Sequence, residues 1–165
     1  MGNLMPTLDQ TLFALTLVAS LGCGLIAGVF YAFSTFIMKA LDHLPSEAGI
    51  SAMQEINITV LTPWFLGVFL GTGVLCLGLG AHALLHWTDP ASQLRFVGSV
   101  TYVIGSILVT ITCNVPRNER LATMTPDQSE STGYWADYLS TWTKWNHVRT
   151  AASLASAALF AIALR

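Results

Sequence analysis

The sequence predicts an all-α fold, an integral membrane four-helix bundle with an interfacial amphipathic segment before the last helix. Three observations lead to it: 53% of the 165 residues are hydrophobic, only 10% are charged, and the apolar residues gather in long runs. A soluble domain would carry about 25% charged residues. We therefore expect a single membrane domain over residues 1–165, and the net charge of −2 argues against a nucleic-acid partner.

The first two spanning helices are expected at residues 11–40 and 51–85. No charged residue occurs between Asp9 and Lys39, so the first apolar run is long enough to cross a bilayer. The second run contains Pro63, which lacks a backbone N–H and is expected to kink the helix there.

The third and fourth spanning helices are expected at residues 95–115 and 145–164. Pro116 is expected to stop or bend the third helix, and a polar loop follows over residues 119–133. Between that loop and the fourth helix, residues 134–145 are amphipathic and aromatic, which favours the membrane interface. The aromatic residues of this segment recur at helical spacing: Trp135, Tyr138 and Trp142.

Two pairs of glycines occupy positions four residues apart in the first two helices. They are Gly24 with Gly28, and Gly67 with Gly71. Spacing of this kind lets a neighbouring helix approach closely. We therefore expect helix contacts at both pairs.

The short last apolar run predicts that polar residues lie at the membrane boundary. Only fifteen residues, Thr150–Leu164, separate Arg149 from the final arginine, whereas a spanning helix needs roughly 20. The span must then begin near Trp145, which places Asn146 and His147 at or below the membrane boundary. Ionisable groups at that depth usually face a bundle interior or a cavity.

Four spans would bring the polar segments of the chain to one end of the bundle. The residues expected there are Tyr31, Ser34, Gln54, Glu55, Asn57, Asn114, Arg117, Asn118, Asn146, His147 and Arg149. We predict a pocket that opens at this end; an ordinary solvated rim is the alternative. At the opposite end His82 and His86, spaced i and i+4, would fit one metal ion or serve as interfacial histidines.

The sequence resembles the anthrone oxygenase-like family of small four-helix membrane proteins, many bacterial members of which are filed as a domain of unknown function. Four stretches carry the resemblance, and they fall in all four helices in order. They are GLIAGVFYAFS at 24–34, AMQEIN at 52–57, NVPRN at 114–118 and WTKWNHVRT at 142–150.

The resemblance implies an oxygenase that converts a hydrophobic, anthrone-like molecule to a quinone with O2, with no cofactor expected; haem or a metal stays an open alternative. The catalytic residues implied are His147 as base, Arg149, Asn114, Asn118 and Glu55. The substrate-binding residues implied are Tyr31, Asn57, Trp142, Trp145, Asn146 and Arg117. No metal ligand is assigned.

The same residues have structural roles as alternatives to these catalytic and binding roles. His147 would serve as an interfacial histidine, Arg149 would snorkel or pair with Glu55, and the asparagines would satisfy backbone groups freed at Pro116. Two other functions also stay open: a carrier of a lipid-soluble ligand such as a quinone, and a haem or metal redox subunit.

The expected partners are a hydrophobic substrate and the lipid bilayer, and a homo-oligomer is an open expectation. The expected location is the bacterial inner membrane, and the four apolar runs predict four spans with both termini on the same side.

Overall fold

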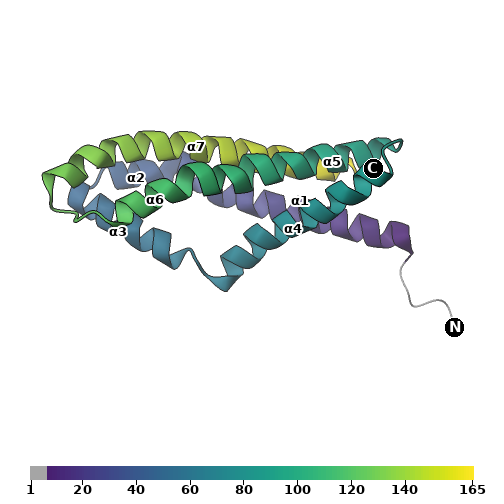
Figure 1. The fold of residues 1–165 in the computed structure, drawn as a ribbon, viewed down its shortest axis with the longest axis horizontal. Coiled ribbons are helices and arrows are strands. Elements are labelled where there is room, and N and C mark those ends of the chain that lie inside the picture. The colour runs from purple at the N-terminus through teal and green to yellow at the C-terminus, as the bar shows by residue number, and fades with distance from the viewer. Residues whose placement is uncertain (1–6) are drawn as a thin grey trace.

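The computed structural model describes residues 7–165, and these confirm the predicted all-α class. Long helical stretches run along the length of the bundle (Figure 1). Their main helices are α1 (Leu8–Ala32), α4 (Pro63–Leu85), α5 (Pro90–Tyr102) and α7 (Ser129–Ile162). Residues 1–6 of the predicted domain lie outside the described part.

The first helix is longer than residues 11–40 at both ends. Thr7 begins α1 with a capping box, in which its side chain accepts from Gln10 N and the Gln10 side chain accepts from Thr7 N. The helix continues through a π-helical turn (η1, Phe33–Ile37) into α2 (Met38–Asp42). The π turn therefore lies at the polar end of the bundle.

The second predicted helix, residues 51–85, is two helices rather than one kinked helix. The first, α3 (Ser46–Thr59), ends before Pro63, and α4 begins there with Pro63 in its first turn. Thr62 takes an extended conformation and its hydroxyl caps Phe65 N, because a residue that precedes proline avoids the helical region. The two helices form a V in Figure 1.

The third helix is longer than residues 95–115, and Pro116 does not stop it. Two π-helical turns (η2, Val103–Leu108; η3, Thr110–Asn114) join α5 to α6 (Val115–Ala122). Proline removes one helical donor, and Arg117 Nη1 donates to the carbonyl of Cys113 beside it. The predicted loop at 119–133 thus shrinks to the few residues between α6 and α7.

The aromatic segment at 134–145 is the first part of α7 and not an element of its own, so the fourth helix begins before residue 145. No proline or glycine interrupts α7 after Gly133, so the helix runs on without a break. The buried face of this segment packs against α2, α3 and α6. The cluster consists of Met38, Leu41, Ile50, Met53, Leu121, Trp135, Tyr138 and Trp142.

Within residues 7–165, three helical stretches are long and apolar enough to cross a membrane, which suggests a membrane protein. They are Leu8–Asp42, Pro63–Leu85 and Pro90–Ala122. The fourth, α7, falls outside this set because its polar and charged residues, among them Asn146, His147 and Arg149, lower its mean hydropathy, although many polar residues of this helix face the bundle interior. Ser153 and Ser156 are fully buried, while Leu154 and Ile162 are exposed. Polar contacts inside and apolar side chains outside are typical of helices that pack in lipid.

Close helix approaches occur at other glycines than those predicted. A Cβ added to Gly24, Gly28, Gly67 or Gly71 would meet nothing within 4 Å, so both predicted pairs face open space. The tight position on α5–α6 is Gly105, where a Cβ would overlap the Cβ of Ala152 on α7.

The start of α1 and the C-terminus lie at the same end of the bundle (Figure 1). Asp9, Arg95 and Arg165 line one shallow pocket there. The polar segments named above therefore share the other end, as predicted, whereas the side of the membrane on which each end lies stays a prediction.

Candidate functional site

A cavity of about 250 Å³ lies where the V of α3 and α4 meets α1, η3, α6 and α7. Its walls are mostly apolar and include five aromatic rings: Phe30, Phe33, Phe65, Phe69 and Trp142. Four of its lining residues are polar: Asn57, Thr110, Asn118 and Arg149. An apolar pocket with a few placed polar groups is the usual form of a small-molecule site.

Arg149 is the charged residue of this cavity, and it is only 5% exposed. Its Nη2 donates to Asn146 Oδ1 at 2.6 Å and its Nη1 donates to Thr110 Oγ1 at 3.2 Å. The guanidinium stands over the ring of Phe30, 4.2 Å from the centroid, and 5.0 Å from that of Trp142. Among the described residues it forms no ion pair. A buried positive charge is therefore surrounded by neutral partners.

Asn146 holds Arg149 in place from behind the cavity wall. It is fully buried, and its Nδ2 donates to the carbonyl of Phe30 and to Ser34 Oγ, both at 2.7 Å. Because α1 and η1 supply these acceptors, the amide oxygen of Asn146 is directed toward Arg149. The guanidinium position is thus fixed jointly by the first and last helices.

Asn114 and Asn118 hold Trp142 in a similar way. Asn118 Oδ1 accepts from Trp142 Nε1 and from Tyr138 Oη, each at 2.8 Å, and Asn114 Nδ2 donates to the Trp142 carbonyl at 3.2 Å. Burial raises the pKa of the Tyr138 phenol, so the hydroxyl stays protonated and keeps donating. These asparagines therefore contact α7 and do not bond to backbone groups freed at Pro116.

Six buried side-chain polar atoms have no partner among the described residues, and three of them belong to residues at this end of the bundle: Asn57 Nδ2, Arg149 Nε and Asn114 Oδ1. Asn57 and Arg149 both line the cavity, so two of these atoms are donors on cavity residues. Buried polar groups nearly always have a partner, which makes such atoms candidates for contact with a ligand. The cavity is thus suited to a flat apolar molecule that carries an oxygen acceptor.

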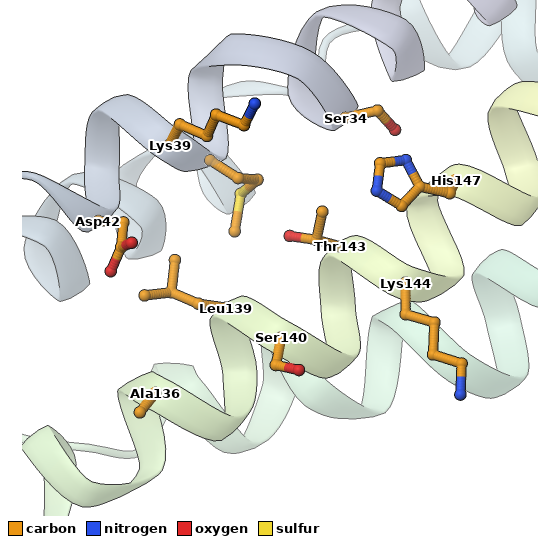
Figure 2. Close-up of a pocket in the computed structure, with 10 residues that line it drawn as sticks. Ser34, Lys39, Asp42, Ala136, Leu139, Ser140, Thr143, Lys144 and His147 are labelled. Carbon is orange, nitrogen blue, oxygen red and sulfur yellow. The ribbon is translucent and has the colours of Figure 1, made fainter.

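His147 lies outside this cavity. It is exposed and lines a groove of about 520 Å³ between α1–α2 and α7, where its ring faces Lys39 (Figure 2). Residues 147 and 149 are two apart on a helix, which places their side chains on nearly opposite sides of α7. The role of His147 as base stays a prediction.

Four more of the predicted residues are absent from the cavity lining: Glu55, Tyr31, Trp145 and Arg117. Glu55 is exposed and forms no ion pair with Arg149, and Tyr31 is 61% exposed. Trp145 is half-buried, and Arg117 Nε donates to Thr141 Oγ1 at 3.1 Å. The structure thus brings together Asn57, Asn118, Trp142 and Arg149, with Asn114 and Asn146 directly behind them.

Sequence analysis did not single out Thr110 or the ring pair Phe65 and Phe69. Thr110 lies four residues before Asn114, and that helical spacing was the available signal. The two phenylalanines are stacked at a centroid distance of 5.8 Å, which supplies a flat wall for the cavity.

The histidine pair at the other end of the bundle is stacked, with ring centroids 4.2 Å apart. His86 Nδ1 lies 2.9 Å from the carbonyl of His82. Within residues 7–165 no group of three or more His, Cys, Asp or Glu side chains is placed to hold a metal ion.

Comparison with known families gives a match over most of the second half of the bundle. The family model described as anthrone oxygenase matches residues 63–159, which is more than half of the chain. The match runs from the first residue of α4 into α7, and it includes Thr110, Asn114, Asn118, Trp142, Asn146 and Arg149. No curated protein and no solved structure matches the sequence.

Proposed function

The chain belongs to the anthrone oxygenase family, and on that premise we propose that it is an integral-membrane oxygenase that oxidises a flat, anthrone-like substrate with O2. The observation that carries the proposal is Arg149, a buried cation with neutral partners at the wall of a cavity of aromatic rings. No cofactor is part of the proposal, and O2 is the co-substrate.

In the proposed reaction, one anthrone and one O2 give one anthraquinone and one water. The methylene carbon between the rings loses a proton, and the resulting anion transfers one electron to O2. The carbon radical and superoxide then combine to a peroxide. Protonation of the peroxide, loss of the second C–H proton and cleavage of the O–O bond give the new carbonyl and one water.

Arg149 supports the first step electrostatically. Deprotonation places negative charge on the carbonyl oxygen of the substrate, and a preorganised cation stabilises such an oxyanion strongly in a site that excludes water. The unpaired donors on Arg149 and Asn57 are suited to that oxygen. The aromatic walls would hold the rings flat and exclude water from the anion.

In the part of the chain that the structure describes, no His, Asp or Glu lines the cavity. We therefore propose that Arg149 lowers the pKa of the substrate, that the first proton leaves to solvent outside the cavity, and that the peroxide later takes a proton back from it. Catalysis by His147 from the neighbouring groove is the competing assignment, and it would require a proton path through the α7 wall.

The same lack of an acid or base in the lining favours a second candidate function, a non-catalytic carrier of a quinone-like ligand. Both functions predict that an anthraquinone binds in the cavity. Only the oxygenase predicts that O2 is consumed.

The experiment that tests the proposal uses labelled oxygen. The purified protein in lipid nanodiscs is given an anthrone under ¹⁸O₂, with empty nanodiscs as the control for spontaneous oxidation. We expect one labelled atom in each anthraquinone and one in water, with one O2 consumed per quinone. If the protein binds the anthrone but oxidises it no faster than empty nanodiscs do, the protein is a carrier.

A further inference from the structure

The groove that contains His147 is a second site, separate from the cavity at Arg149. It lies between α1–α2 on one side and the first half of α7 on the other (Figure 2). Its floor is apolar, formed by Met38 and Leu139, and its rim carries basic and hydroxyl side chains. We propose that this groove binds the phosphate headgroup of an anionic membrane phospholipid.

The first argument is charge. Lys39, Lys144 and His147 line the groove, and within the described residues none of them makes a hydrogen bond or an ion pair. Asp42 is the acid of the groove, and it does not come within ion-pair distance of Lys39. Figure 2 shows Lys39 and His147 directed toward each other, with the Lys144 ammonium turned away at the rim. The groove is therefore electropositive and its cations are free to bind an anion.

The second argument is the hydroxyl groups. Ser140 and Thr143 line the groove, and neither makes a side-chain hydrogen bond within the described residues. On the same helix Thr141 and Thr150 donate back to the carbonyls of Asp137 and Asn146. Thr143 in Figure 2 directs its hydroxyl into the groove. Hydroxyl donors without a partner, next to the ammonium groups of Lys39 and Lys144, are suited to the several acceptor oxygens of a phosphate.

The third argument is the position of the groove relative to the membrane, which favours a lipid headgroup over a soluble phosphate as the ligand. Lys39 is the first charged residue after Asp9 on a helix that is apolar enough to span, so the groove lies where the apolar surface ends. One or two turns deeper on the same helix faces, Tyr31, Ala151 and Leu154 are exposed. A headgroup in the groove would leave its acyl chains on this apolar surface. Basic pockets between spanning helices bind anionic headgroups in this way.

The experiment is native mass spectrometry of the full chain titrated with phosphatidylglycerol and with phosphatidylcholine of the same acyl chains. We expect one phosphatidylglycerol to bind at least tenfold more tightly than phosphatidylcholine. The double variant Lys39→Gln/His147→Gln should remove that preference. Arg120→Gln is the matched control, because Arg120 is at the same end of the bundle but stands over Tyr134, 4.3 Å from the ring centroid. This variant should keep the preference.

Three results would overturn the proposal. One is equal binding of the two lipids by the wild type, and another is an unchanged preference in the double variant. The third is displacement of the lipid by millimolar inorganic phosphate, which would identify a free-phosphate site. Binding of lipid requires no turnover, so failure of this proposal is distinguishable from failure of the oxygenase assignment.

Discussion

Asn146 Oδ1 accepts a 2.6 Å hydrogen bond from Nη2 of Arg149 in the interior of the bundle. A buried guanidinium is more often paired with a carboxylate, which would neutralise it. The amide positions Arg149 and leaves its charge uncompensated. The charge is therefore available to an anionic state of a ligand in the cavity.

Replacing Asn146 by Asp tests whether that uncompensated charge matters. Asn146→Asp keeps the size of the side chain but supplies a counterion, so we predict that the rate of anthrone oxidation falls at least tenfold. The measurement is O2 uptake at saturating anthrone. The control is Ser34→Ala, which removes a neighbour of Asn146 without changing the charge and should keep most of the rate; an active Asn146→Asp would contradict the account.

Removing the Asn118 amide should destabilise the polar end of the bundle. Asn118→Ala leaves Tyr138 Oη and Trp142 Nε1 without their acceptor, and each unsatisfied buried donor costs about 1–3 kcal/mol. We expect the free energy of unfolding, measured by SDS titration in mixed micelles, to fall by about 2–6 kcal/mol for the two donors together. Tyr138→Phe should then cost less in the Asn118→Ala background than in the wild type, and equal costs would argue against the hydrogen bond.

Packing between α5–α6 and α7 should tolerate no methyl group at Gly105. A Cβ there overlaps the Cβ of Ala152, so Gly105→Ala should lower the free energy of unfolding by about 1–3 kcal/mol in the same titration. Gly28→Ala is the matched control, because its Cβ would meet no atom within 4 Å. Equal effects of the two substitutions would mean that the helices do not approach at Gly105.

The class of the fold and the shared polar end could be predicted from the sequence, because apolar runs and polar positions along the chain determine both. The local course of the helices could be predicted only in part. Thr62 and Pro63 are typical of the start of a helix, but the same two residues are also compatible with a kink in a continuous helix. The π-helical turns before Pro116 depart from the 3.6-residue period, so periodicity does not reveal them.

The candidate site shows the same division. That Asn114, Asn118, Trp142, Asn146 and Arg149 lie at one end follows from topology. Which of the three residues on α7 face inward depends on how α7 is rotated about its own axis, and this is set mainly by its packing against α1 and α5. Sequence analysis grouped His147 with Arg149 because they are close along the chain, whereas the helix separates them to different sides.

The most direct test of the account compares Arg149→Gln with His147→Gln in the anthrone and O2 assay in nanodiscs. We predict that Arg149→Gln lowers turnover by about a hundredfold or more, which is the usual cost of removing an oxyanion donor. His147→Gln should keep most of the wild-type rate. Arg149→Lys retains the charge and should recover part of the activity, which separates loss of charge from loss of fold. Full activity in Arg149→Gln, or loss of turnover in His147→Gln, would contradict the assignment of the cavity at Arg149 as the site of oxidation.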